Sequence, residues 1–150
     1  MVMFWGCFSK HGTGPLVEVQ NTMKGPQYIE ILEEYLLPEL EAAGTPMVYM
    51  QDNAPCHKSK LVMDFMAANN VELLKWPPQS PDLNPIENLW AIIKGRRQKK
   101  YGVPATKAQL TDQIFDIWNG IGPELVSKLS DSAIDRFKAC ILAQGKMTKY

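Results

Sequence analysis

A proline-rich segment in the middle of the chain places the strongest limit on its fold. Residues 77–85 read Pro-Pro-Gln-Ser-Pro-Asp-Leu-Asn-Pro, so four of these nine residues are prolines. Proline has no backbone N–H, and its ring clashes with a preceding helical turn, so this stretch cannot form a helix or a central strand. We therefore expect a rigid connector here, with regular structure on both sides of it.

The apolar pattern differs between the two sides of this connector. Before it, short runs of strand-forming residues alternate with segments of helical spacing, whereas after it only helical spacing recurs. This order predicts an α/β fold, a mixed sheet flanked by helices, with a helical carboxyl-terminal part. The expected elements are strands at 2–8, 16–19, 47–50 and 71–76, a turn at 12–15, a helix at 27–40, and further helices that begin at Ser59, Asn84, Thr106 and Ser132.

Charge is unevenly distributed, although the formal net charge is zero. Residues 1–93 contain 5 Lys/Arg and 11 Asp/Glu, whereas residues 94–150 contain 11 Lys/Arg and 5 Asp/Glu. This split predicts an acidic part that can hold cations and a basic part that can hold phosphates; ordinary solvated helix surfaces are the alternative. We expect no membrane span, because no apolar run approaches the roughly 20 residues that one needs. The three distant cysteines form no CxxC pair, which favours a reducing compartment.

Asp52 is the first candidate for chemistry. It follows the apolar run Met47–Met50 directly, at the strand end where open α/β sheets bind ligands. A carboxylate at such a position is held rigidly, as a metal ligand must be. An aspartate that merely begins a turn is the alternative.

Glu87 is the second candidate, and it also has a purely structural explanation. In the segment Asn84-Pro85-Ile86-Glu87, the asparagine is a good N-cap, proline suits the first helical position, and glutamate at the third can reach back to the cap. Either role holds a carboxylate at a helix amino terminus, where the helix dipole favours its ionised form.

Together, Asp52 and Glu87 indicate a metal site. The 34 residues between them are enough for a helix, a strand and the connector, a path that can return the chain to the same sheet edge. Two carboxylates meeting there would suit Mg²⁺, which commonly takes one or two protein carboxylates together with phosphate oxygens. Such a centre would support the displacement of a phosphodiester.

The segments around these two residues resemble a known family. Gln51-Asp52-Asn53-Ala54-Pro55-Cys56-His57 and the segment 80–90, Ser-Pro-Asp-Leu-Asn-Pro-Ile-Glu-Asn-Leu-Trp, are similar to the two signature segments of Tc/mariner-type DDE transposases, and the 34-residue spacing agrees. The resemblance implies an RNase H-like fold, dependence on Mg²⁺ or Mn²⁺, and cleavage and strand transfer of DNA. It assigns Asp52 as the second catalytic aspartate and Glu87 as the catalytic glutamate.

The sequence departs from this family in one respect that bears on activity. The family has an earlier catalytic aspartate on its first strand and amino-terminal helix-turn-helix modules, and no residue here fills those places. We therefore expect residues 1–150 to be a catalytic domain truncated at its amino terminus, with two metal ions bound only in the intact domain. Glu18, the only acid in the two opening strands, is expected to be solvated. Losing a central strand would expose apolar edges, so self-association is also expected.

Other polar residues surround the two carboxylates. Asn53, His57 and Asn88 are candidates for orienting the carboxylates, and an uninvolved loop histidine is the alternative for His57. A basic run follows Glu87 on the same predicted helix and is expected to contact the DNA backbone; a nuclear-localisation signal or a solvated helix end are the alternatives. The residues of this run are Lys94, Arg96, Arg97, Lys99 and Lys100.

Two functional hypotheses follow. The first is a transposase catalytic domain that acts on transposon ends and target DNA, in the nucleus or in the cytoplasm of a prokaryotic host. The second is a catalytically inactive remnant that binds nucleic acid or protein, and it rests on the missing first carboxylate. A glycosidase with two carboxylates is disfavoured, because no aromatic sugar platform is visible.

Overall fold

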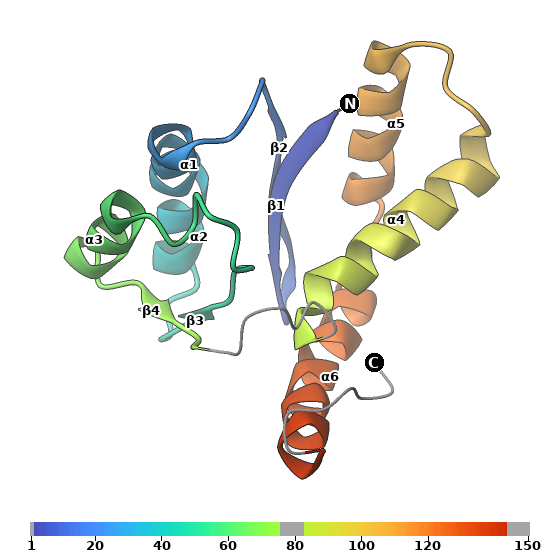
Figure 1. Cartoon of the computed structure of the whole chain (residues 1–150). Helices are drawn as coiled ribbons and strands as arrows, with labels where there is room; N and C mark the ends of the chain where they lie inside the picture. The colour runs from blue at the N-terminus through green and yellow to red at the C-terminus, as the bar shows by residue number, and fades with distance from the viewer. Residues whose placement is uncertain (1, 76–82, 144–150) are drawn as a thin grey trace. The chain divides into compact units, whose positions relative to one another are not determined.

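The computed structural model describes residues 2–75 and 83–143 (Figure 1). The chain forms two compact units, one of residues 1–18 with 81–150 and the other of residues 19–80, and each is described by itself. Most of the predicted connector lies outside the described residues, which resume at Leu83. None of the helices within residues 2–75 and 83–143 could span a lipid bilayer.

The first unit combines a β-hairpin with three helices. Strand β1 (Met3–Ser9) pairs with β2 (Gly12–Val19), and α4 (Pro85–Tyr101) packs against both α5 (Lys107–Asn119) and α6 (Pro123–Leu142). Helix α6 also packs against β1. The helices bury one continuous apolar core, formed by Leu89, Ile93, Ile117, Trp118, Ile121, Val126 and Leu129.

Trp118 ties the hairpin to this core. Its indole Nε1 donates a hydrogen bond to the Gly14 carbonyl oxygen at 3.0 Å, and its ring stacks on Trp90 with ring centroids 5.4 Å apart. The turn predicted at 12–15 is therefore wrong: Gly14 and Pro15 lie inside β2, and the chain turns at residues 10–11. A two-stranded hairpin accommodates Pro15, because both of its strands are edges.

The second unit packs two helical segments beside a short parallel strand pair. Strand β3 (Val48–Tyr49) leads through α3 (Lys60–Ala68) to β4 (Glu72–Leu73), and β3 and β4 pair in parallel. Because parallel strands end at the same sheet edge, β4 brings the chain back to the edge where Asp52 lies, as predicted. Helix α1 (Gly25–Ile31) packs against α3, and the buried apolar residues of this unit include Tyr28, Leu32, Leu36, Val62 and Met66.

The helix predicted at 27–40 is found, but with a widened turn in its middle. It comprises α1 (Gly25–Ile31), a π-helical turn η1 (Leu32–Leu36) and α2 (Leu37–Ala42). The Leu37 N–H donates to the carbonyl oxygen of Leu32, five residues back. Pro38 follows directly, and it lacks an N–H and would crowd a regular helical turn before it, which accounts for the wider turn.

The last predicted helix start is also wrong. Ser132 lies in the middle of α6, which begins nine residues earlier at Pro123. Its hydroxyl donates to the Leu129 carbonyl oxygen at 2.8 Å and accepts from Arg136 Nε at 3.2 Å, so it bonds within the helix rather than capping it. The predicted starts at Ser59, Asn84 and Thr106 are confirmed, each with a side-chain cap hydrogen bond.

Candidate active site

Asp52 lies three residues after β3, and its side chain is 53% exposed. Both of its recorded side-chain contacts fall on the same oxygen. Oδ1 accepts a hydrogen bond from the Ala54 backbone N–H at 3.0 Å and lies 2.6 Å from Nδ1 of His57. Within the described residues, Oδ2 has no hydrogen-bond or ion-pair partner, so this oxygen is available to a ligand.

These contacts also set the charge of Asp52. The hydrogen bond from His57 lowers the pKa of the Asp52 carboxyl below 3.8, and the Ala54 N–H and the charge of His57 lower it further, against partial desolvation, which raises it. Asp52 is therefore ionised at neutral pH, as an oxygen ligand for a divalent cation must be.

His57 is fixed from behind by a residue that sequence reasoning did not identify. Its imidazole stacks on the ring of Tyr28, with centroids 4.0 Å apart and planes 28° apart. The Tyr28 hydroxyl donates to Oε1 of Gln51 at 2.6 Å and lies 3.1 Å from the Tyr49 hydroxyl. A tyrosine on the inward face of the helix at 27–40 was the available signal, but its partner His57 is 29 residues away in sequence.

Glu87 lies in the first turn of α4, where its side chain is exposed. The helix start is built as predicted: Oδ1 of Asn84 accepts from the Ile86 N–H at 3.3 Å, and the Asn84 carbonyl oxygen accepts from the Glu87 N–H at 3.2 Å. Asn84 and Pro85 are both buried, so the backbone that carries Glu87 is anchored in the first unit.

The two candidate carboxylates belong to different units, Asp52 to the second and Glu87 to the first. Asn53, which follows Asp52 in the sequence, and Asn88 on α4 are both partly buried. Their role in orienting the carboxylates stays a prediction. Among the described residues, no three His, Cys, Asp or Glu side chains gather as a metal-binding group.

Glu18 is not the solvated residue that the sequence predicted. Its side chain is 20% exposed, Lys107 Nζ lies 3.2 Å from Oε1, and the Thr111 hydroxyl donates to Oε2 at 3.2 Å. Both oxygens are thus already engaged between β2 and α5. This makes Glu18 a poor candidate for a third metal ligand.

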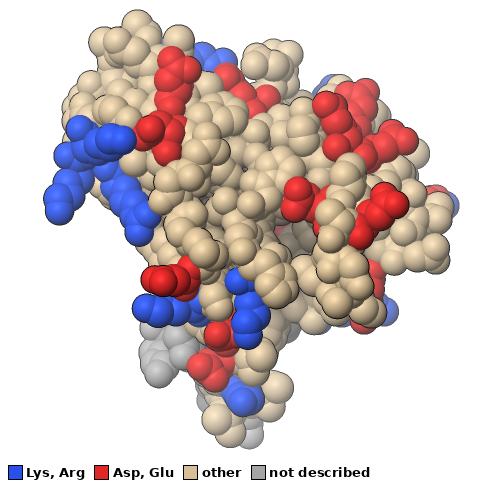
Figure 2. Space-filling model, turned by 180° about the vertical axis from the view of Figure 1, so that it is seen from behind, with Lys and Arg blue, Asp and Glu red and all other residues tan. Residues whose placement is uncertain are grey.

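The basic run on α4 divides into two groups. Arg97 is engaged, because it donates to the Gly102 carbonyl oxygen at 2.9 Å and to Oε1 of Gln113 at 3.2 Å; Lys100 lies 2.7 Å from Oδ2 of Asp116. The other three cations are exposed, and no ion pair is recorded for them within the described part of the chain: Lys94, Arg96 and Lys99. Figure 2 shows blue side chains gathered near the end of α4, and red ones over α1–α2, whose residues 25–42 include five glutamates and no Lys or Arg.

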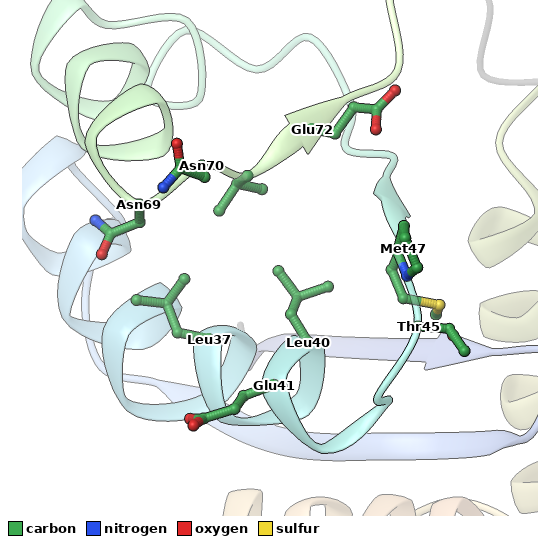
Figure 3. A pocket seen from close by; sticks show the side chains of 10 residues that line it. Leu37, Leu40, Glu41, Thr45, Met47, Asn69, Asn70 and Glu72 are labelled. Atoms are coloured by element: carbon green, nitrogen blue, oxygen red, sulfur yellow. The ribbon is translucent and has the colours of Figure 1, made fainter.

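A pocket of about 410 Å³ lies elsewhere in the second unit (Figure 3). Leu37 and Leu40 of α2 form one side of it, Asn70 and Glu72 lie across from these two leucines, and Met47 lies at its edge. Asp52 does not line it. The pocket is therefore separate from the candidate active-site carboxylate.

Comparison with known proteins agrees with the sequence resemblance. Residues 2–108 match the family described as DDE superfamily endonuclease. The chain is 40% identical over 151 aligned positions to the transposable element Tc1 transposase of Caenorhabditis elegans, and 43% identical over 151 to the Tcb1 transposase of Caenorhabditis briggsae. Each alignment covers 99% of this chain and 54% of the relative, so the chain spans about half the length of these proteins.

Solved structures with a similar fold come from Mos1 transposase. The catalytic domain with Raltegravir and Mg has a TM-score of 0.84 at 18% identity, and covers 99% of this chain and 77% of that one. The same domain with Mn has a TM-score of 0.85 at 18% identity, with 99% and 78% covered. A Mos1 paired-end complex with the left transposon end has a TM-score of 0.83 at 20% identity, with 97% and 44% covered. The likeness confirms the predicted RNase H-like α/β fold.

Proposed function

The chain belongs to the DDE superfamily endonuclease family, and from that premise we propose that it supplies the catalytic part of a transposase that cleaves DNA and transfers strands. The single observation that carries the proposal is the arrangement of Asp52: one oxygen is held by two donors and the other is open. An ionised, half-exposed carboxylate held in this way is suited to one-oxygen coordination of a hard cation.

We propose that Asp52 and Glu87 hold Mg²⁺ or Mn²⁺ in the intact protein. The residues fit the ions, because both are carboxylates on anchored backbone and the open Asp52 oxygen is the ligand type that these metals prefer. When bound, the metal would activate the attacking oxygen and stabilise the charge on the leaving one. The Mos1 catalytic domain with Mg and with Mn supports this choice of ion.

DNA is the proposed substrate. Lys94 follows Glu87 by seven residues on α4, which places it about 10 Å further along the same helix face. Its exposed ammonium, with the guanidinium of Arg96 and the ammonium of Lys99, would bind phosphates next to the reacting one. The Mos1 complex with a transposon end supports transposon DNA as the ligand.

The nucleus is the proposed location in a eukaryotic host. A fluorescent fusion that imaging finds only in the cytoplasm would contradict this location.

The proposed function is tested by Glu87→Gln and Asp52→Asn in an intact protein that contains this region. Each substitution keeps the size of the side chain and removes its negative charge, so Mg²⁺-dependent nicking of transposon-end DNA should fall by at least about a hundredfold while the protein stays folded. Glu124→Gln is the matched control, because Glu124 also follows a proline in the first turn of a helix, α6. Undiminished nicking by Glu87→Gln would overturn the assignment.

A catalytically inactive, nucleic-acid- or protein-binding remnant is the second candidate. It is motivated by the ligand count, because Asp52 and Glu87 are only two of the three carboxylates that the family resemblance calls for. The same assay separates the two functions: a remnant would bind DNA and nick it no faster than Glu87→Gln does.

We also propose that the chain self-associates. Helix α6 exposes three large apolar side chains in its second half, Ile134, Ile141 and Leu142. Exposed apolar surface of this kind favours association between copies. Light scattering that gives a monomer mass at high concentration would contradict the proposal.

A further inference from the structure

A series of side-chain contacts leads away from Asp52: Asp52 contacts His57, His57 stacks on Tyr28, and Tyr28 bonds to Gln51. We infer that Tyr28 is a positioning residue, which fixes the His57 imidazole and through it the orientation of the Asp52 carboxylate. This inference rests on the proposed function, because the orientation matters most if Asp52 holds a metal.

The Tyr28 ring stacks on the His57 imidazole. Tyr28 lies in α1 and is completely buried, and its ring stacks on the His57 ring at a centroid distance of 4.0 Å, with the two planes 28° apart. The side chain of His57 is itself only 13% exposed. The imidazole is therefore confined to the plane from which Nδ1 reaches Asp52 Oδ1.

The Tyr28 hydroxyl fixes the ring in turn. A tyrosine hydroxyl has one proton, and Tyr28 donates it to Oε1 of Gln51, so the Tyr49 hydroxyl, 3.1 Å away, must donate to Tyr28 Oη. Gln51 then donates through Nε2 to the His57 carbonyl oxygen at 3.5 Å. These bonds join α1 to the end of β3 and to both sides of the Asp52 turn.

This arrangement dictates the state of the imidazole. Nδ1 must carry a hydrogen to donate to Asp52 Oδ1, so neutral His57 must be the Nδ1–H tautomer. With Oδ1 held by this hydrogen and by the Ala54 N–H, rotation of the carboxylate is restricted and Oδ2 points in one direction. Leucine would fill a buried helical position equally well, whereas a buried hydroxyl is unfavourable unless it is bonded. A tyrosine at position 28 is therefore explained by its contacts with His57 and Gln51.

The tautomer of His57 provides a test that needs neither metal nor activity. The chain contains only two histidines, and exposed His11 serves as an internal reference. Long-range ¹H–¹⁵N NMR spectra of the metal-free chain would be recorded at a pH of about 8, where an ordinary histidine is neutral. We expect the Nδ1–H form for His57 in the natural chain, its loss in Tyr28→Leu, and a partial loss in Tyr28→Phe, which keeps the ring but removes the hydroxyl.

Tyr35→Leu is the matched control, because Tyr35 lies in the same helical segment at η1, and it should leave the His57 tautomer unchanged. A folded Tyr28→Leu chain that keeps the Nδ1–H form would overturn the inference. If Tyr28→Leu does not fold, Tyr28→Phe decides the matter: a tautomer population identical to that of the natural chain would overturn it.

Binding of Mn²⁺ alone, followed by the electron paramagnetic resonance signal of the free ion, links the inference to the site. Loss of an outer partner of a metal ligand weakens metal binding by about 10- to 100-fold. Tyr28 acts through His57, so we expect an effect at the lower end of this range. The Kd for Mn²⁺ should be roughly tenfold higher in Tyr28→Leu and unchanged in Tyr35→Leu. A natural chain that does not bind Mn²⁺ would count against the proposed function, while the tautomer would still decide the role of Tyr28.

Discussion

At the scale of single residues, Asp52 shows how one carboxylate can serve both the fold and a ligand. Its Oδ1 completes a turn through the Ala54 N–H, which is the structural role that aspartate often has after a strand. Its Oδ2 remains open. The turn and the ligand were alternatives at the level of sequence, and the structure accommodates both, because each uses a different oxygen.

The contact between His57 and Asp52 predicts a pH dependence. Because the pKa of folded Asp52 lies below 3.8, its stabilising contribution is present above pH 3.8 and is lost as the pH falls through the lower folded-state value. His57→Phe keeps a ring on Tyr28 but removes the donor, so the pKa of Asp52 should rise toward 3.8. Carbon-13 NMR of the carboxyl group would measure the shift.

The same substitution should change stability only slightly. The Asp52 side chain is half-exposed, so the contribution is expected to be below about 1 kcal/mol. His11→Phe, which alters an exposed histidine, is the control and should leave the Asp52 pKa unchanged. A pKa that stays equally low in His57→Phe would show that the Ala54 N–H alone lowers it.

At the scale of helices and strands, local signals were predictable and long-range ones were not. Ser59, Asn84 and Thr106 begin helices because each cap bonds to an N–H two or three residues ahead, a signal contained in a few residues. Gly14 resembles a turn residue locally, but the Trp118 indole 104 residues away holds it within a strand. Ser132 looks like a cap only if the earlier start at Pro123 is overlooked.

The contact between β1 and α5 yields a stability prediction. A Cβ atom added at Gly6 would lie 2.8 Å from Cη2 of Trp118 and 3.2 Å from Cδ1 of Leu16. Trp118 cannot easily yield, since its ring is stacked and its Nε1 is bonded. Gly6→Ala should therefore destabilise the chain by about 1–3 kcal/mol, the usual range for overpacking, measured by urea unfolding.

Gly12→Ala is the control for this prediction. Gly12 lies at the start of β2, and an added Cβ would meet nothing within 4 Å. Its midpoint in urea should stay close to that of the natural chain. Equal effects of the two substitutions would mean that the Trp118 ring moves aside at little cost.

At the scale of the whole molecule, the structure shows which elements carry the acidic and the basic residues. The glutamates of residues 25–42 account for much of the acidic part, and α4 carries the start of the basic part. The sequence predicted this division but not which cations are available, because Arg97 and Lys100 find their partners only when α4 packs on α5.

This distinction predicts how salt affects DNA binding. Each phosphate contact steepens the dependence of log K on log salt concentration by about 0.9. Replacing Lys94, Arg96 and Lys99 together by glutamine should reduce the slope by about 3, whereas Lys100→Gln should change it little. Titration of duplex DNA over a range of salt concentrations, monitored by fluorescence anisotropy, measures the slope.

Three lysines elsewhere provide the control. Lys24, Lys128 and Lys138 are exposed and carry the same total charge. Replacing them by glutamine changes the net charge equally, so an equal loss of slope would mean that binding follows net charge and not the α4 cations.

The stacked pair of Trp90 and Trp118 gives the molecule a built-in optical label. Three of its four tryptophans, Trp5, Trp90 and Trp118, belong to the first unit, whereas Tyr28 and Tyr49 belong to the second. Two indoles 5.4 Å apart are close enough for their electronic transitions to couple, which gives a circular dichroism band. The tyrosine absorbance reports mainly on the second unit, which holds three of the five tyrosines. Heating the chain while following that band and the tyrosine absorbance would reveal whether the two units melt as one cooperative body or in succession.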